Sequence, residues 1–446
     1  MYTLPKETKI TAKVLNEVIE YNETFANRYK KLCNYYIGNH DIVNRVKEET
    51  NINNKVMVNH AKYITDTNVG YLMGNPVDYQ IIGNGEYDIN PLLDEYKKQT
   101  INDLDTEIAK DVSIYGLQYE YVYANQDSEP RSCEVDNERT IIVYDDTVEH
   151  NKLFGLTYRP IYKGQSLSHY EVICADKKEI HTYNCFSKSL KETGEAQPHA
   201  FGDVPFIMYK NNPELLGDFE PVISLIDAYN LLQSDRINDK EQLVDAILCL
   251  YGMDFTPEQA ELLKESRMLA SIPEDGKVEY LVKTLNENEV DVLRQNIEND
   301  IHKISMTPNM TDENFVGNSS GVAIKYKLLA FEQNIQNKER YMEKGLMERF
   351  KLYNHFLNTK SKMELIPAEE VDVVFTRNLP SNDFEISQMI NNLSDLVDAE
   401  TLISQLSFIK DASEVIKAKE LEEEKPANDY SMSFNENEVN DMNTEE

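Results

Sequence analysis

The 446-residue sequence predicts an α+β protein, because two kinds of hydrophobic pattern occupy separate stretches of the chain. Between residues 118 and 185, short runs of alternating apolar residues are separated by polar turns, which predicts an antiparallel meander. Over most of the remaining chain, apolar residues recur at intervals of three and four, which predicts amphipathic helices. Strands and helices that segregate in this way favour α+β over an alternating α/β architecture.

Three helices are expected before the meander. The first spans residues 14–36, and Gly38 fits its C-cap. The second begins after Asn59, which fits an N-cap, and a short strand at 77–81 follows it. The third spans residues 101–115 and leads directly into the first strand of the meander.

Five short strands are expected in the meander. They lie at residues 118–124, 139–144, 154–162, 169–174 and 179–184. The stretch from 194 to 213 is richer in Gly and Pro, which predicts an exit from this domain.

Long helices dominate the chain after residue 217. Pro221 fits the first turn of a helix whose apolar stripe reaches Ile247, which corresponds to about 45 Å if the helix is unbroken. A compact insert, 251–285, separates it from a second helix that opens with Asn286 and Glu289 in capping-box positions. The apolar stripe of this second helix consists of Val290, Leu293, Ile297, Ile301 and Ile304.

A polar loop at residues 311–320 follows Pro308 and leads into a very long helix, 324–357, of about 50 Å. A strand at 371–376 and further helix from 384 to 419 are expected next. Residues 420–446 contain ten carboxylates against one lysine, which predicts a disordered acidic tail.

The charge balance disfavours tight binding of nucleic acid. The formal net charge is −34, from 79 acidic and 45 basic residues, so the surface as a whole repels phosphate. The five cysteines are scattered and form no C-x-x-C pair, which favours reduced thiols in a cytosolic setting. Charged and polar residues dominate Met1 to Lys13, and no run of 18 apolar residues occurs, so we expect neither a secreted nor a membrane-spanning protein.

The sequence predicts neither a catalytic site nor a metal site, and no cofactor is expected. P-loop, G-x-G-x-x-G and H-E-x-x-H motifs are missing. The string at 317–321 fits G-x-S-x-G, but a polar loop precedes it, which disfavours Ser319 as a nucleophile. Cys174, His181 and Cys185 lack a fourth ligand at a spacing typical of zinc.

Two features leave a functional alternative open. Asp145 and Asp146 end an apolar run and could hold two catalytic metals, although Asp pairs commonly cap turns after strands. Tyr119, Tyr121 and Tyr123 alternate and could stack on single-stranded nucleic acid, although tyrosine on a half-buried sheet needs no ligand.

Two local strings resemble a known family. Residues 53–76 read NNKVMVNHAKYITDTNVGYLMGNP and are similar to a stretch near the N-terminus of siphovirus-type phage portal proteins. Residues 320–328 read SGVAIKYKL and resemble the start of the longest helix in that family. The order of segments is also similar over nearly the whole chain.

This resemblance implies a ring at a vertex of the virion capsid, usually of twelve subunits, and no enzymatic activity. The ring would be the channel through which double-stranded DNA is packaged and ejected without sequence specificity. Expected partners are terminase, the major capsid and scaffolding proteins, and a head-completion or adaptor protein. Assembly would take place in the cytoplasm of the bacterial host, with no contact to membrane.

The resemblance also implies named regions, which we assign by residue number. They are a mixed α/β wing at 1–217, to which the strand 371–376 returns, stem helices at 218–249 and 287–307, a small clip at 250–286, a tunnel loop at 308–321, a long helix and helical crown at 322–425, and the acidic tail at 426–446. The tunnel-loop residues expected to face DNA are Thr311, Asp312, Glu313, Asn314, Phe315, Val316, Gly317 and Asn318. The stripe of the second stem helix would provide packing.

Two other functions are compatible with the same residues. A helical scaffold or interaction protein without a channel would also carry long helices and an acidic tail. A two-metal nuclease or nucleotidyltransferase would use Asp145 and Asp146. Formation of a ring distinguishes the first alternative, and a Mg²⁺-dependent activity on DNA distinguishes the second.

Overall fold

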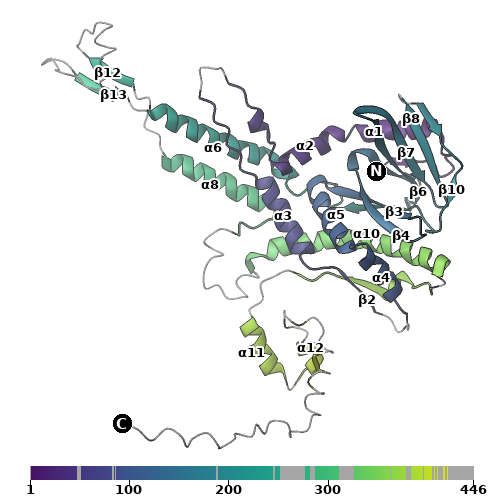
Figure 1. The fold of residues 1–446 in the computed structure, drawn as a ribbon. Helices are drawn as coiled ribbons and strands as arrows, with labels where there is room; N and C mark the ends of the chain where they lie inside the picture. Colours follow the sequence, from purple (N-terminus) through teal and green to yellow (C-terminus); the bar gives the residue numbers. More distant parts are fainter. Residues whose placement is uncertain are drawn as a thin grey trace, which may run out of the picture. The chain divides into compact units, whose positions relative to one another are not determined.

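The computed structural model describes most of the chain. The described residues are 2–47, 52–82, 85, 87–186, 189–244, 247–251, 277–281, 287–310, 326–361, 363–377, 383–394, 396–403, 406, 409, 415–416 and 419. The chain divides into two compact units, Met1–Asn378 and Leu379–Glu446. Strands and helices occupy largely separate segments of the first unit, so the predicted α+β class is confirmed (Figure 1).

The N-terminal helices begin and end largely where local side chains dictate. The helix predicted at 14–36 is in fact two, α1 (Ala12–Glu23) and α2 (Ala26–Ile37). The break occurs because the Thr24 hydroxyl donates to the carbonyl of Tyr21 at 2.7 Å, while the local amides form tighter i→i−3 hydrogen bonds. Gly38 caps α2 at a φ of 90°, as predicted, because this left-handed conformation favours glycine.

Side-chain capping also sets the start of the next helix. In α3 (His60–Met73), the side chain of Asn59 accepts a hydrogen bond from the Lys62 amide at 2.9 Å, which confirms the predicted N-cap. Strand β2 (Asp78–Ile81) follows, as predicted. Helix α4 (Asn90–Lys98) comes next and was not predicted from the sequence. The predicted third helix is α5 (Ile101–Tyr115). Helices α3 and α5 pack against each other.

A seven-stranded sheet contains the predicted meander. Strands β5 (Thr140–Asp145), β6 (Lys152–Lys163), β7 (Ser166–Ala175) and β8 (Glu179–Phe186) pair antiparallel in sequence order. Strand β1 (Tyr2–Leu4) adds to the free edge of β5 in parallel, while β9 (Ser189–Glu192) and β10 (Gln197–Pro198) pair with β8. Leu15 and Val18 of α1 join the apolar core on this sheet.

The first predicted meander strand belongs to a different sheet. Strand β3 (Leu117–Ala124) lies between β4 (Pro130–Val135) and β11 (Phe206–Lys210), so its assignment to the meander is wrong. The prediction that 194–213 leaves the domain is also wrong, because β11 returns to pair with β3 over five residues. The two sheets touch closely where Phe206 packs over Gly155, since a Cβ at Gly155 would lie 2.2 Å from that ring.

Helix α10 (Leu329–Ser361) organises the largest apolar core. Its 33 residues correspond to about 50 Å, which confirms the predicted length. Strand β14 (Val371–Val374), after the short helix η4 (Ala368–Glu370), pairs antiparallel with β2, so the C-terminal strand does return to the N-terminal part. Core residues contributed by α10 include Phe331, Ile335, Met342, Leu346, Phe350, Tyr353 and Leu357.

A fully buried arginine joins four of these elements. The guanidinium of Arg349 on α10 donates to Glu120 of β3 at 2.8 Å and to Asp105 of α5 at 2.5 Å. The hydroxyl of Tyr209 on β11 donates to Glu120 at 2.5 Å. Arg349 and Glu120 are 0% exposed and Asp105 is 2% exposed, so each charge depends on the others for compensation.

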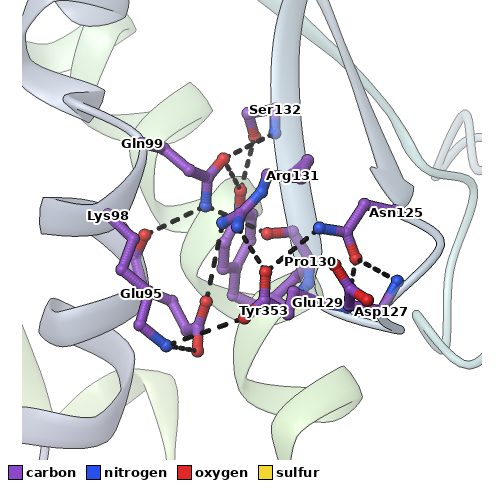
Figure 2. Close-up of polar contacts among 10 residues, drawn as sticks. All are labelled: Glu95, Lys98, Gln99, Asn125, Asp127, Glu129, Pro130, Arg131, Ser132 and Tyr353. Carbon is purple, nitrogen blue, oxygen red and sulfur yellow. Dashed lines mark hydrogen bonds and ion pairs between the residues drawn. The ribbon is translucent and has the colours of Figure 1, made fainter.

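A second polar cluster closes the outer edge of β4 (Figure 2). The side-chain amide of Gln99 donates to the carbonyl of Pro130 at 3.0 Å and accepts from the amide of Ser132 at 2.9 Å. Tyr353 of α10 donates to Gln99 or Ser132, each at 3.0 Å. Gln99 therefore pairs with the backbone amide and carbonyl groups of an edge strand, much as a neighbouring strand would.

The second unit holds short helices. The helix predicted at 384–419 is interrupted, because α11 (Asp383–Leu393) and α12 (Ala399–Ile403) are separated by a turn. The predicted tail at 426–446 lies outside the described residues. No helix in the described part of the chain combines the length and apolar character needed to cross a bilayer.

We predict that Arg349→Ala lowers the free energy of unfolding by about 3–5 kcal/mol, because it leaves Glu120 and Asp105 buried without a counter-charge. The free energy of unfolding of Arg349→Lys should lie between the values of this variant and of the wild type, because lysine keeps the charge but lacks the planar guanidinium that bonds both carboxylates. Urea denaturation measures both, with Lys351→Ala, at an exposed position on the same helix, as control. Equal midpoints for Arg349→Ala and Lys351→Ala would contradict the role of this cluster.

Candidate functional site

Two neighbouring helices form the most distinctive surface of the first unit. Helix α6 (Ile223–Val244) follows the short helix η3 (Glu220–Val222), and it runs beside α8 (Glu287–Ile304) (Figure 1). The first helix is shorter than predicted, about 33 Å, because Ile247 already belongs to β12 (Ile247–Tyr251). Strand β12 pairs antiparallel with β13 (Lys277–Leu281). Residues 252–276 and 282–286, including the predicted cap at Asn286, lie outside the described residues.

One face of α6 is buried although it is polar. Asn230, Ser234 and Asn238 lie four residues apart and are at most 4% exposed. Their side-chain oxygens accept hydrogen bonds from three backbone amides of the segment 54–58. The amide of Val58 bonds to Asn230 at 2.8 Å, that of Val56 to Ser234 at 2.9 Å, and that of Asn54 to Asn238 at 2.7 Å.

This polar ladder has a simple geometric basis. Four residues of α-helix advance about 6 Å, and two residues of extended chain advance about 6.6 Å. Every second amide of the segment 54–58 therefore meets the next polar residue of the helix. The ladder was missed at the sequence level, although three small polar residues at intervals of four within a long helix were a visible signal.

Charged residues strengthen the same contact. Arg45 and Lys47 form ion pairs with Asp235 at 2.9 and 3.4 Å. The side-chain amide of Asn54 donates to Glu241 at 2.8 Å. Residues 45, 47 and 54–58 thus hold the polar side of α6, while Ile226 and Tyr229 of the same helix are buried in the cluster shared with α8.

Apolar side chains remain exposed on both helices. On α6, Leu231 is 45% exposed and Ile237 is 40% exposed. On α8, Val292, Leu293 and Ile304 are 56%, 49% and 51% exposed. Among the described side chains of this helix pair, five large aliphatic residues are therefore left in contact with water in a single chain.

The stripe predicted on α8 divides into two groups. Ile301 is fully buried and Ile297 packs beside it, in a cluster that includes Val222 and Ile226. Val290 is half-buried. Leu293 and Ile304 are the two half-exposed members, so they find little packing within a single chain.

A buried ion pair holds the base of α6. Asp218 accepts hydrogen bonds from Ser113 of α5 at 2.5 Å and from Asn211 at 2.7 Å, and it also pairs with Lys338 of α10. Burial lowers the pKa of Lys338, against the opposing effect of Asp218. Gly217 permits this approach, because a Cβ there would lie 2.2 Å from the carbonyl oxygen of Ile114. A lysine within the apolar stripe of the long helix was the sequence signal for this pair.

The junction of α3, α6 and α8 contains buried aromatic rings. His60 packs edge-on against Tyr229 at 4.7 Å and against His302 at 5.9 Å between ring centroids. Burial, assisted by the neighbouring His302, lowers the pKa of His60 to about 4. This imidazole is therefore neutral at physiological pH and acts as an aromatic packing residue.

The aspartate pair after β5 shows the geometry of a turn. The Asp145 carboxylate accepts from the Thr147 hydroxyl at 2.6 Å and from the Asn151 amide at 3.0 Å. Hydrogen bonds from Thr147 and then Asn151 lower the pKa of Asp145, while Asp146 is exposed. In the part of the chain that the structure describes, no group of three His, Cys, Asp or Glu residues could hold a metal ion.

Other candidate residues are structural or lie outside the described residues. Tyr119 and Tyr121 are buried, and Tyr121 stacks on Phe206 at 4.6 Å, so the platform for nucleic acid is wrong for both residues. Cys174 is fully buried opposite His181, whose imidazole bonds to Glu192. The tunnel-loop residues 311–318 and Ser319 lie outside the described residues.

We predict that Ser234→Ala and Asn230→Ala each destabilise the contact between α6 and the segment 54–58, by about 1–3 kcal/mol, because a buried amide loses its acceptor. Hydrogen exchange should become faster at the amide of Val56 in the first variant and of Val58 in the second. Ser224→Ala, at an exposed position of α6, is the control. Unchanged protection at both amides would show that the ladder contributes nothing.

Comparison with known proteins gives the family. Residues 15–429 match the family described as phage portal protein, SPP1 Gp6-like. The portal protein of Bacillus phage SPP1 is 25% identical over 389 residues, which cover 82% of this chain and 76% of the relative. The portal protein of Clostridium phage phiCD119 is 20% identical over 440 residues, which cover 89% of this chain and 93% of the relative. The resemblance seen in the sequence is thus confirmed, and the chain belongs to the SPP1 Gp6-like family of phage portal proteins, which are structural rather than catalytic and serve at the capsid in DNA packaging.

Proposed function

We propose that copies of this chain form a closed ring, with twelve subunits as the expected number, around a channel for double-stranded DNA. The observation that carries this proposal is the set of half-exposed aliphatic residues on α6 and α8. Apolar surface removed from water contributes about 25 cal/mol per Å², so neighbouring subunits would gain stability by covering these side chains. The packing role of Leu293 and Ile304 would then lie between subunits.

A ring is expected if one face of the helix pair contacts a different face of the next copy. When one face of a helix pair contacts a different face of the next copy, the contact is heterologous, and repetition closes into a ring if the rotation permits. The polar side of α6 is already covered by the segment 54–58, which restricts the faces that remain for neighbours. The paired helices would then surround the axis as the stem.

The charge of the chain suits passage of DNA. A net charge of −34 gives long-range repulsion of phosphate, so DNA moving through the ring would find few strong attachment points. Sequence-specific contacts are not needed for this role. DNA packaging and DNA ejection would use the same channel.

The remaining regions are assigned around this stem. Residues 1–217 with β14 would form the wing, 250–286 the clip, and 322–425 the long helix and crown. Strand β12, which begins at Ile247 within the range assigned to the stem, pairs with β13 beyond the two helices and would lead into the clip (Figure 1). The tunnel loop, 308–321, would connect α8 to the long helix and reach the channel. No role is assigned to the acidic tail at 426–446.

The partners follow from the position of a portal. As a component of the virion capsid, the ring would occupy one vertex and contact the major capsid protein and, during assembly, the scaffolding protein. Terminase would dock on it while DNA enters, and a head-completion or adaptor protein would dock afterwards. Assembly would take place in the cytoplasm of the bacterial host.

We predict that the purified wild-type protein forms rings and that the double variant Leu231→Asp, Leu293→Asp stays as single subunits. Both side chains are already half-exposed in one subunit, so the new charges should spare folding and prevent only the contact between copies. Native mass spectrometry and negative-stain imaging distinguish rings from subunits, and Asn299→Asp on α8 controls for added charge. Wild-type protein that remains monomeric at micromolar concentration would contradict the ring and favour a scaffold without a channel.

We predict separately that replacing residues 314–318 by a Gly-Ser linker leaves rings and their incorporation into proheads near normal but reduces the number of DNA-filled heads. Asp312 and Glu313 would repel phosphate, while Phe315 and Val316 would make short-range contact with the duplex. A linker removes the apolar contact and keeps the charges. Wild-type filling and retention of DNA in the linker variant would refute this role.

A further inference from the structure

A basic pocket lies in the first unit, where the two larger sheets meet α10. It has a volume of about 400 Å³ and is lined by residues of β5, β6, β11 and α10 and of the turn after β5. The charged lining residues are Lys152, Asp203, Lys210, Lys344, Glu348 and Lys351. Lysines outnumber carboxylates here although the net charge of the chain is −34, so the pocket favours an anion within an acidic protein.

Both carboxylates of the lining already have partners. Glu348 pairs with Lys152 at 2.5 Å, and Asp203 pairs with Lys177, which lies outside the pocket, at 3.3 Å. The other lysines of the lining form no ion pair in the described part of the chain; they are Lys210, Lys344 and Lys351. Their ammonium groups therefore surround the pocket without a counter-charge.

Lys210 of β11 is the least solvated of these three lysines. Its side chain is half-buried, whereas Lys344 and Lys351 are exposed. Burial lowers the pKa of Lys210 against the opposing effect of Glu348, and the like charge of Lys344 lowers it further. The charged form of Lys210 is thus destabilised in the folded chain, and an anion bound beside it would compensate that charge.

Tyr144 of β5 adds a hydrogen-bond donor to the same pocket. The residue is 8% exposed, belongs to the apolar cluster that contains Phe206, and lines the pocket. Its hydroxyl has no hydrogen-bond partner among the described residues. Burial, and then the charge of Glu348, raises the pKa of Tyr144, so the hydroxyl keeps its proton and can donate. A nearly buried hydroxyl without an acceptor points to a ligand that accepts hydrogen bonds.

We propose that this pocket binds a phosphate group. The ammonium groups of Lys210, Lys344 and Lys351 neutralise its charge, and the hydroxyl of Tyr144 donates to one of its oxygens. Lysine is a common phosphate ligand, and hydrogen bonds to ionised groups are roughly twice as strong as neutral ones. Pockets for small molecules measure about 300–1,000 Å³, so this one has room for phosphate with part of its water or for a small phosphoester.

A small phosphate-bearing molecule suits the pocket better than the backbone of DNA. A duplex would bring many further phosphates close to a surface that is acidic as a whole, and their repulsion would oppose binding. A single phosphate group has only the local lysines near it, because charges beyond about 10 Å are largely screened at moderate salt.

The bound group would connect elements that are distant in sequence. Strands β5 and β6 belong to the seven-stranded sheet, β11 belongs to the three-stranded sheet, and α10 contributes to the largest apolar core. On α10, the residues Tyr341, Lys344, Glu348 and Lys351 recur at intervals of three and four, which places them on one face of the helix. Binding would stabilise the contact between these elements, whether or not rings form.

The test uses the full-length protein in a phosphate-free buffer. Isothermal titration with sodium phosphate should give saturable binding, and the melting temperature should rise relative to sodium chloride at equal ionic strength. A short DNA duplex is titrated with and without phosphate: competition between the two assigns the pocket to the DNA backbone, and its absence assigns the pocket to a small molecule. No saturable binding of either phosphate or the duplex would overturn the proposal.

Three variants locate the site. Lys210→Gln and Lys344→Gln should each raise the Kd for phosphate at least about tenfold, and Tyr144→Phe, which removes only the hydroxyl, about fivefold. Lys163→Gln makes the same change of charge at an exposed position outside the pocket and should bind like the wild type. Equal affinity in Lys163→Gln and the three pocket variants would show nonspecific attraction and would overturn the site.

A further measurement separates loss of binding from loss of folding. Without phosphate, Lys210→Gln should melt at or above the temperature of the wild type, because the substitution removes a partly buried charge and its repulsion from Lys344. With saturating phosphate, the wild type should melt at the higher temperature. A Lys210→Gln variant that melts below the wild type without phosphate, and gains as much stability from phosphate as the wild type, would show a packing role for Lys210 and overturn the proposed site.

Discussion

The buried guanidinium of Arg349 is the constraint on which the first unit depends. It fixes the long helix α10 against α5 and β3 through Asp105 and Glu120, and Tyr209 adds β11 to the same network. A buried charge tolerates few alternative arrangements, because any displacement leaves carboxylates without compensation. The network therefore specifies how the helical and sheet parts dock, while the surrounding apolar core supplies most of the stabilising free energy.

Elements with local causes were predictable from the sequence, and pairings between distant segments were not. Gly38 and Asn59 set helix ends by backbone conformation and side-chain capping, which depend on neighbouring residues alone. The sheet of β3 depends on β11, and no periodicity reveals that distant partner. The early end of α6 at Val244 was missed because the apolar residues that follow suit both helix and strand.

The candidate site shows the same division between pattern and context. Sequence periodicity located α6, α8 and the stripe on α8, but it could not separate Ile301, which is buried, from Leu293, which is half-exposed. That difference depends on which residues of other elements lie opposite. Asp218 and Lys338 tie the base of α6 to α10, so the helix pair and the long helix form one connected structure rather than two independent arms.

The ladder between α6 and the segment 54–58 joins two repeats of slightly different length. The two axial advances differ by about 0.6 Å per rung, since four residues of helix advance less than two residues of extended chain. Over three intervals between rungs, the offset between the backbone amides and the helix side chains would approach about 2 Å, which exceeds the tolerance of a hydrogen bond. A ladder of this kind is therefore short, and its three hydrogen bonds, at 2.8, 2.9 and 2.7 Å, all lie within the tolerance. A contact of this kind fixes axial position without any large side chain, which leaves the rest of the helix circumference free for other surfaces.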